Sequence, residues 1–145
     1  MSIRRMKVGH ALAIAVCVAG AGLELGPRSQ AAGENAGADV KPVFGQKLPN
    51  VPGQSLTAVV VNYAPGGKSG KHRHAGSVFA YVLSGTIRSE NSVTGPARDY
   101  KAGESFFEPP GSAHLVSENA SQTEPASLLA IFVAEDGAQL TSFDQ

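Results

Sequence analysis

The residues of this sequence best suited to chemistry are three histidines. His72 and His74 flank Arg73, and His114 lies further along the chain. Side chains on a β-strand alternate between its two faces, so this spacing predicts that His72 and His74 project from one face. Two imidazoles on one strand face, joined by a third from elsewhere, can bind a transition metal. The fourth histidine, His10, falls in a segment that we expect to be removed, so the mature chain keeps only these three.

The residues around the histidines form two motifs, and these resemble the two motifs of the cupin family. The first reads G-x5-H-x-H-x3,4-E-x6-G in the family and is matched here by Gly66, His72, His74 and Gly85. The second reads G-x5-P-x-G-x2-H-x3-N and is matched by Gly103, Pro109, Gly111 and His114. The resemblance runs from about Val51 to Val133. It implies a double-stranded β-helix (jelly-roll) barrel and a chemistry similar to that of quercetin dioxygenase-like cupins.

The sequence departs from the family pattern at two positions. Val78 stands where the family carries a glutamate ligand, and Asn119 lies one residue late, with Glu118 in its place. The spacing from His74 keeps Val78 on the inward face, but valine cannot bind a metal. Three neutral imidazoles would leave the full double charge of a divalent ion, which strengthens it as a Lewis acid. The alternative is a site that has lost its function, although cupins with three histidine ligands are known and include oxygen-using enzymes.

Glu108 is the candidate for a carboxylate supplied from another position. It follows Phe106 and Phe107 and precedes Pro109, an unusual setting for a charge without a partner. The sequence leaves three roles open: an exposed residue at a strand end, a fourth ligand, or a general base beside the metal. Glu90 and Glu118 are weaker candidates for such a carboxylate. The ligand types allow Fe, Mn, Ni, Cu or Zn, without choosing among them.

The rest of the chain predicts an all-β fold. Short apolar or alternating segments separated by Gly, Pro and Asn predict about eight strands and no amphipathic helix. The predicted strands are 56–63, 78–83, 86–91, 97–101, 105–108, 113–118 and 126–134, with an extended or edge segment within 40–55. The run 78–83 is apolar throughout, which predicts a strand buried on both faces. This pattern favours an antiparallel sandwich or barrel, and the resemblance selects the jelly roll.

The first thirty-one residues have the parts of a secretory signal peptide. Arg4, Arg5 and Lys7 precede an apolar stretch of 18 residues, Val8 to Leu25, and a small-residue site follows at 29–31. The alternatives are an uncleaved anchor, for which the stretch is short and interrupted, and a lipoprotein modified at Cys17. The expected organisation is 1–31 signal peptide, 32–50 extended lead, 51–134 cupin barrel and 135–145 tail, located in the periplasm or secreted. N-terminal mass spectrometry of the periplasmic fraction should find Ala32, and an intact Met1 in the cytoplasm would contradict this.

The composition of residues 32–145 narrows the possible functions. Their net charge is −3, and no basic patch suggests a nucleic-acid partner. They contain no Cys, so thiol catalysis and disulfides are excluded. We therefore expect a metal-dependent enzyme, dioxygenase-like, acting on a small polar or aromatic molecule. The alternatives are a Lewis-acid isomerase or lyase, and a cupin that binds a ligand or metal without turnover. No stable membrane span is expected after cleavage, and the edge segment near residues 40–51 offers a surface for a homodimer.

Overall fold

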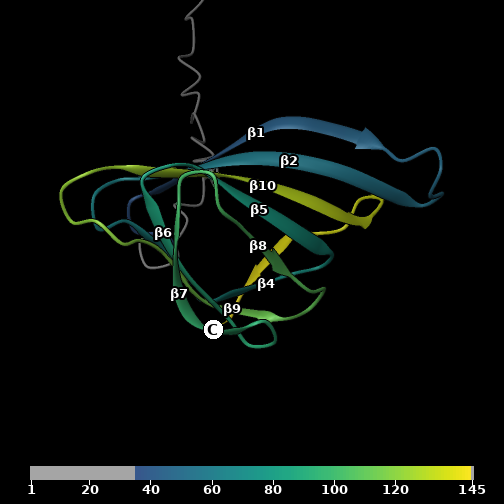
Figure 1. Ribbon diagram of the computed structural model, residues 1–145. Helices are drawn as coiled ribbons and strands as arrows, with labels where there is room; N and C mark the ends of the chain where they lie inside the picture. Colours follow the sequence, from purple (N-terminus) through teal and green to yellow (C-terminus); the bar gives the residue numbers. More distant parts are fainter. Residues whose placement is uncertain (1–34, 145) are drawn as a thin grey trace, which may run out of the picture.

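The computed structural model describes residues 35–144, which form eleven β-strands in two antiparallel sheets. The two sheets face each other across a common interior (Figure 1). This is the jelly-roll barrel that the sequence predicts. Within the described range, no helix has the length and apolar character needed to cross a membrane. The predicted signal peptide, residues 1–31, lies outside the described residues.

The first sheet has five strands in the order β1-β2-β10-β5-β8. Its strands are β1 (Ala38–Lys47), β2 (Gln54–Tyr63), β10 (Ala126–Glu135), β5 (Ser77–Ser84) and β8 (Ser105–Glu108). The inner face of this sheet carries most of the apolar core, because alternate residues of β2, β5 and β10 point inward. The largest of these inward side chains are Tyr63, Leu128 and Phe132.

The second sheet carries the three histidines that the sequence singles out. Its order is β11-β4-β9-β6-β7, and the short strand β3 also pairs with β9. Its strands are β11 (Thr141–Phe143), β4 (His72–His74), β9 (Ala113–Asn119), β6 (Thr86–Asn91), β7 (Gly95–Lys101) and β3 (Lys68–Ser69). The inner face of this sheet is more polar than that of the first, with Ser89, Asn91, His114 and Ser117 all buried. The polar inner face of the second sheet and the apolar inner face of the first sheet meet in the interior of the barrel, where the three histidines lie.

Two motif glycines have conformations that only glycine adopts easily. Gly85 turns β5 into β6 with φ +68°, and a Cβ there would lie 2.8 Å from the carbonyl oxygen of Pro125. Gly111 has φ +70° and donates its N–H to the carbonyl of His74 at 2.8 Å. This bond ties the turn between β8 and β9 to the strand that carries the first two histidines. The glycines of the motifs therefore position the site without taking part in its chemistry.

The strand pattern differs from the prediction in two respects. β5 is buried on one face only, because Phe79, Tyr81 and Leu83 are 39–45% exposed on the outside of the sheet. The apolar run predicts burial on both faces, but these large apolar side chains are not covered by protein in this chain. The number of strands exceeds the expected eight, because β3, β4 and β11 also pair, the last formed by part of the tail. The segment near residue 40 is the edge strand β1, as expected.

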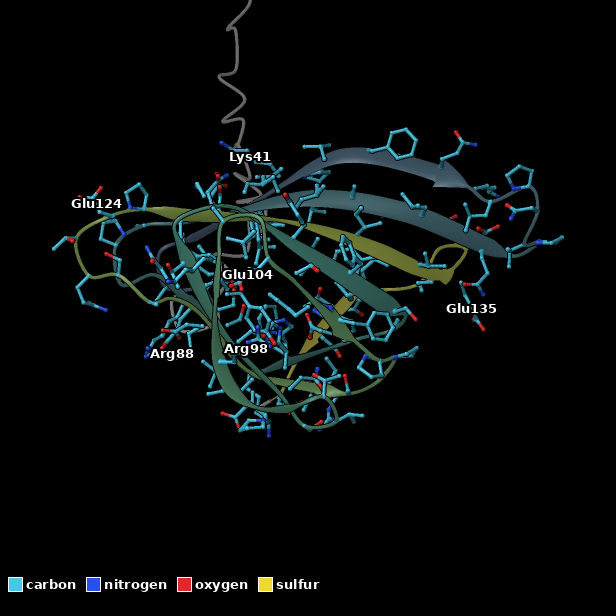
Figure 2. The ribbon with its side chains drawn as sticks, viewed as in Figure 1. Lys41, Arg88, Arg98, Glu104, Glu124 and Glu135 are labelled. Carbon is cyan, nitrogen blue, oxygen red and sulfur yellow. The ribbon has the colours of Figure 1, made fainter. Side chains whose placement is uncertain are left out.

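Apart from Glu108, the charged side chains lie mainly on the outside of the barrel, with both signs interspersed. Figure 2 shows Lys41, Arg88, Arg98 and Glu104 spread over different strands and turns. Arg88 bonds Asp99 across β6 and β7, with Nε 2.8 Å from Oδ1. Such exposed pairs contribute little to stability, on the order of 0–1 kcal/mol each.

Candidate metal centre

The three histidines meet on the inner face of the second sheet. His72 and His74 are 6% and 7% exposed on β4, whereas Arg73 between them points outward. Arg73 bonds Asp144 there, with Nε 3.3 Å from Oδ1, as the alternation predicts. His114 on β9 is 3% exposed, and its Cα is the cross-strand partner of the His72 Cα. The local strand geometry therefore brings together all three residues that the sequence singled out.

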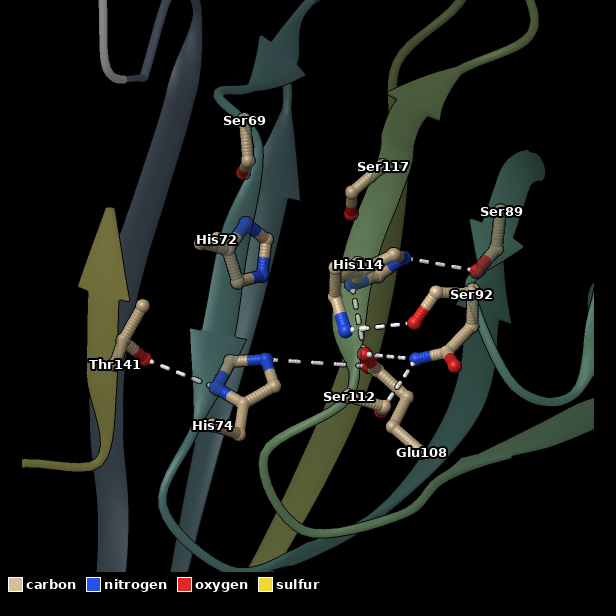
Figure 3. A network of polar contacts seen from close by, with 12 residues as sticks. Ser69, His72, His74, Ser89, Ser92, Glu108, Ser112, His114, Ser117 and Thr141 are labelled. Atoms are coloured by element: carbon tan, nitrogen blue, oxygen red, sulfur yellow. Dashed lines mark hydrogen bonds and ion pairs between the residues drawn. The ribbon is translucent and has the colours of Figure 1, made fainter. Parts of the chain in front are cut away.

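One nitrogen of each imidazole is held by a neighbouring polar group. His72 Nδ1 lies 2.6 Å from the Gly70 carbonyl oxygen, and His74 Nδ1 lies 3.1 Å from that of Leu140. His114 Nε2 lies 2.8 Å from the Ser89 hydroxyl oxygen (Figure 3). Such outer contacts fix the ring orientation and the tautomer of metal-binding histidines. The other nitrogen of each ring is not held by these outer contacts: Nε2 of His72, Nε2 of His74 and Nδ1 of His114.

The free nitrogens fit a metal ion. One candidate ligand atom from each of the three histidines lies within 4.8 Å of those of the others. Among the described residues, His114 Nδ1 is the one buried side-chain nitrogen or oxygen that makes no hydrogen bond of good geometry, although Glu108 Oε2 lies 3.1 Å from it. A metal ion at this nitrogen would give it the directed partner that it lacks. The three buried histidines could therefore hold a metal ion, and their chemistry alone does not select which one.

Burial favours the neutral, metal-binding form of the rings on β4. Burial lowers the pKa of His72 to about 4, although its bond to the Gly70 carbonyl opposes the shift. Burial also lowers the pKa of His74, and the nearby carboxylate of Glu108 works against it. Both rings are therefore unprotonated at neutral pH, which is the state that binds a metal.

Glu108 is buried beside the histidines. It ends β8 and is 3% exposed, so its interpretation as an exposed strand-end residue is wrong. Its Oε2 lies 3.1 Å from His114 Nδ1, and its Oε1 lies 3.9 Å from His74 Nε2. Asn91 Nδ2 also donates to Oε2 at 3.3 Å. These contacts explain how the charged Glu108 side chain is tolerated between Phe106-Phe107 and Pro109-Pro110, because its polar partners come from other strands.

The carboxyl of Glu108 is held in its charged form. Burial is the largest single influence and would raise its pKa, but the hydrogen bond from His114 and the charges of His114, His74 and His72 together outweigh it. The pKa of Glu108 therefore lies below its usual range, and the side chain is a carboxylate at neutral pH.

Val78 faces the interior, as the spacing from His74 predicts. It is 1% exposed, and its Cα is the cross-strand partner of the Glu108 Cα on β8. Cross-strand partners on one face have their Cβ atoms about 5 Å apart. The carboxylate that the family motif places at position 78 is absent, and another carboxylate stands on the adjacent strand at the same level of the barrel.

The site opens into a cavity of about 590 Å³. Apolar side chains from the first sheet form most of its wall, and the histidines and Glu108 form one polar part of it. Its apolar wall residues include Val59, Val61, Val78, Ala80, Phe106, Leu128, Ala130 and Phe132. A volume of this size matches a small organic ligand.

The weaker carboxylate candidates lie elsewhere. Glu118 is on the outside of β9, with its Oε1 3.6 Å from Arg88 Nη1. Glu90 on β6 is not part of the cavity wall. Of the three tyrosines, Tyr81 is exposed and only Tyr63 lines the cavity.

Several residues around the site were not predicted from the sequence. Ser89 and Asn91 orient His114 and Glu108, and Thr141 Oγ1 lies 3.2 Å from His74 Nδ1. Ser and Asn in a polar strand carry no signal that separates a site residue from a surface residue. The alternation along β6, where Ile87, Ser89 and Asn91 are all buried, was the one available hint.

Comparison with known proteins identifies the family. The sequence profile described as "Cupin domain" matches residues 59–132, half of the chain, and the chain therefore belongs to the cupin family. A cupin-like protein from Thermotoga maritima superposes with a TM-score of 0.57 at 21% identity, covering 77% of this chain and 79% of that one. No curated protein matches the sequence at a significant level.

Two enzymes share the fold at similar distance. A DMSP lyase, DddQ from Ruegeria pomeroyi, has a TM-score of 0.52 at 22% identity, covering 61% of this chain and 42% of the lyase. An oxalate oxidase, solved with the substrate analogue glycolate, has a TM-score of 0.57 at 23% identity, covering 74% of this chain and 55% of the oxidase. This chain thus spans less than half the length of the lyase and about half that of the oxidase. At these identities the likeness shows the fold alone.

Proposed function

We propose that this protein is an exported, metal-dependent enzyme, an oxidoreductase of the dioxygenase-like kind, that acts on a small polar or aromatic molecule. One observation carries the proposal: three buried imidazoles with free nitrogens and one buried carboxylate converge on one part of an apolar-walled cavity. A protein that only stores a metal needs the ligands, but it has no need of an organic-sized cavity beside them.

The distant structural relatives are consistent with turnover in this fold. One is named as an oxidase of a small acid and another as a lyase. The two names belong to different reaction classes, so they support an enzyme without choosing its reaction. One fold hosts many functions, and the choice rests on the site of this chain.

The residues of the chain have distinct tasks in this proposal. A divalent transition ion (Fe, Mn, Ni, Cu or Zn), held by His72, His74 and His114, supplies Lewis acidity and, where it is redox-active, electron exchange with oxygen. Glu108 accepts a proton at Oε1, since Oε2 already accepts a hydrogen bond from Asn91 Nδ2. Val78 and its apolar neighbours exclude water from the substrate, which strengthens the electrostatic interactions in the site.

A lyase or isomerase is the second candidate, and the position of Glu108 favours it. An elimination needs a carboxylate placed to take a proton beside a group that polarises the substrate, and it needs no oxygen. Glu108 is buried and ionised, and its carboxylate oxygens lie 3.9 Å from His74 Nε2 and 3.1 Å from His114 Nδ1. The two candidates therefore use the same residues and differ in their dependence on oxygen.

The test is oxygen uptake by the metal-loaded protein with a panel of phenols, diketones and flavonols. We expect uptake with at least one substrate, and none after chelation or in the His72→Ala variant. Mass spectrometry of the same panel incubated without oxygen tests the second candidate. Product formation under these conditions would show a lyase or isomerase instead of an oxidoreductase. Tight binding with neither uptake nor conversion would show a binding module.

A further inference from the structure

Three hydroxyl groups form a second polar cluster in the cavity wall. Tyr63 Oη lies 2.8 Å from Ser117 Oγ and 3.0 Å from Ser69 Oγ. Tyr63 is 2% exposed, and all three residues line the cavity. They come from three different strands, β2, β9 and β3. We call them the hydroxyl trio. The interactions proposed above for the metal centre do not involve them.

The hydroxyl trio lies across the histidines from Glu108. Figure 3 shows Ser69 and Ser117 on one side of the pair formed by His72 and His114, with Glu108 on the other. The strand register agrees, since Ser69 pairs with Ser117 and His72 pairs with His114. Ser117 follows His114 by three residues, but β9 bulges between them, so that they lie opposite Ser89 and Asn91, two residues apart on β6; the span is about 7 Å along the strand. This span is comparable to the length of a small aromatic molecule.

The hydroxyl trio has capacity to bind a further group. Three hydroxyls carry three donor hydrogens, and the two bonds within the trio use two of them. One donor and several lone pairs remain, at the serine ends of the cluster. Burial raises the pKa of Tyr63, partly opposed by its bonds to Ser117 and Ser69, so its phenol stays neutral at physiological pH. The trio can therefore donate to a carbonyl or hydroxyl and accept from a hydroxyl.

The charges around the cavity disfavour an anion at the hydroxyl trio. Among the described residues that line it there is no Lys or Arg, and the charged ones are Asp39 and Glu108. Asp39 adjoins Ala38, whose Cα is the cross-strand partner of the Tyr63 Cα. Asp39 pairs on the exposed surface with Lys41, their Oδ2 and Nζ 3.1 Å apart, so no free cation remains for a ligand. The only strong positive charge would be a metal at the histidines.

We propose that the hydroxyl trio binds the far end of the substrate, and that the substrate is a small acid with an apolar, preferably aromatic, body and an uncharged hydroxyl or carbonyl opposite its acid group. The acid oxygens lie at the metal centre, and the body contacts the apolar wall formed by Val61, Ala80 and Leu128. The terminal hydroxyl or carbonyl bonds Ser69, Ser117 or Tyr63. This inference rests on the proposed function for the placement of the acid end.

The test compares ligands that differ only at the far end. The protein is loaded with zinc, which has no redox chemistry, and titrated calorimetrically with 4-hydroxybenzoate and 4-methylbenzoate. The pair 4-hydroxyphenylacetate and 4-methylphenylacetate repeats the comparison with one more carbon. Terephthalate places a second anion at the far end. Tyr63→Phe removes one oxygen from the trio, and Tyr81→Phe is the matched control, because Tyr81 lies on the outside of β5.

We expect the wild type to bind at least one hydroxylated acid about five- to tenfold more tightly than its methyl analogue, the effect of one net hydrogen bond. Tyr63→Phe should remove most of that preference while leaving zinc affinity and methyl-analogue affinity unchanged, and Tyr81→Phe should keep it. Terephthalate should bind more weakly than 4-methylbenzoate.

Equal affinities within both pairs would overturn the inference, as would Tyr63→Phe weakening both members of a pair alike. Terephthalate binding more tightly than 4-methylbenzoate would also overturn it. A wild type that fails to bind zinc would instead defeat the proposed function. In that case the same pairs, titrated into the metal-free protein, still decide whether the trio prefers a hydroxyl.

Discussion

Replacing His72, His74 or His114 by alanine is expected to remove stable metal binding. Three ligands are the minimum of a firm site, so loss of one should lower metal affinity by at least about a hundredfold, more than the usual effect of an outer contact. Metal content after dialysis, measured by elemental analysis, gives the result. The fold should persist, because the apolar core lies mainly on the first sheet and does not depend on the site.

Arg73→Ala is the matched control for the histidine variants. Arg73 lies between His72 and His74 on the same strand but points outward, where it bonds Asp144 and the Gly111 carbonyl. Its removal should leave metal content unchanged. Full metal occupancy in all three folded histidine variants would show that the free nitrogens do not form the metal centre.

Glu108→Gln is expected to lower turnover by roughly 10²- to 10⁴-fold, the usual contribution of a positioned proton acceptor. The amide keeps the shape of the side chain and loses the charge. If the carboxylate also binds the metal, metal affinity should fall in the same preparation, because an amide is a weaker and neutral ligand. Glu118→Gln is the control, since Glu118 lies near Arg88 on the outside. A Glu108→Gln variant with normal turnover and metal content would remove Glu108 from the site.

Exchanging positions 78 and 108 tests whether the carboxylate has moved between strands. Glu108→Val should lower metal affinity, and adding Val78→Glu in the double variant should restore it, because the two Cα atoms are cross-strand partners. Val78→Glu alone should raise the affinity for a divalent ion by adding a second negative group. Unchanged affinity in a folded Val78→Glu variant would show that position 78 does not face the metal.

The sequence predicted the parts of the molecule that depend on local spacing. The two-residue period of a strand predicted that His72 and His74 point inward and Arg73 outward. The Gly, Pro and Asn residues of the turns predicted where most strands begin and end. Both depend on neighbours within a few residues. For the same reason the inward position of Val78 was predictable from its spacing to His74.

What the sequence did not predict depends on pairing between distant segments. Glu108 is buried because His114 and Asn91 reach it from other strands, and no local pattern around Glu108 contains that information. The edge at β11 forms because Thr141–Phe143 pairs with β4, far away in the chain. The hydroxyl trio likewise joins three strands. The opposite error concerns Phe79 and Tyr81, which were expected to be buried and are exposed. A large apolar side chain does not by itself show whether other parts of the protein cover it.

The side chains around the metal centre come from both sheets: the histidines from β4 and β9 of one, and Glu108, which could serve as a fourth ligand, from β8 of the other. An ion held by all four would act as a non-covalent cross-link between the two halves of the barrel. Its concentration would then set the resistance of the protein to heat and proteolysis, adding about 4 kcal/mol at a thousand times its dissociation constant. In a compartment where metal supply fluctuates, the lifetime of the protein would follow that supply, so that molecules without an ion would be cleared first.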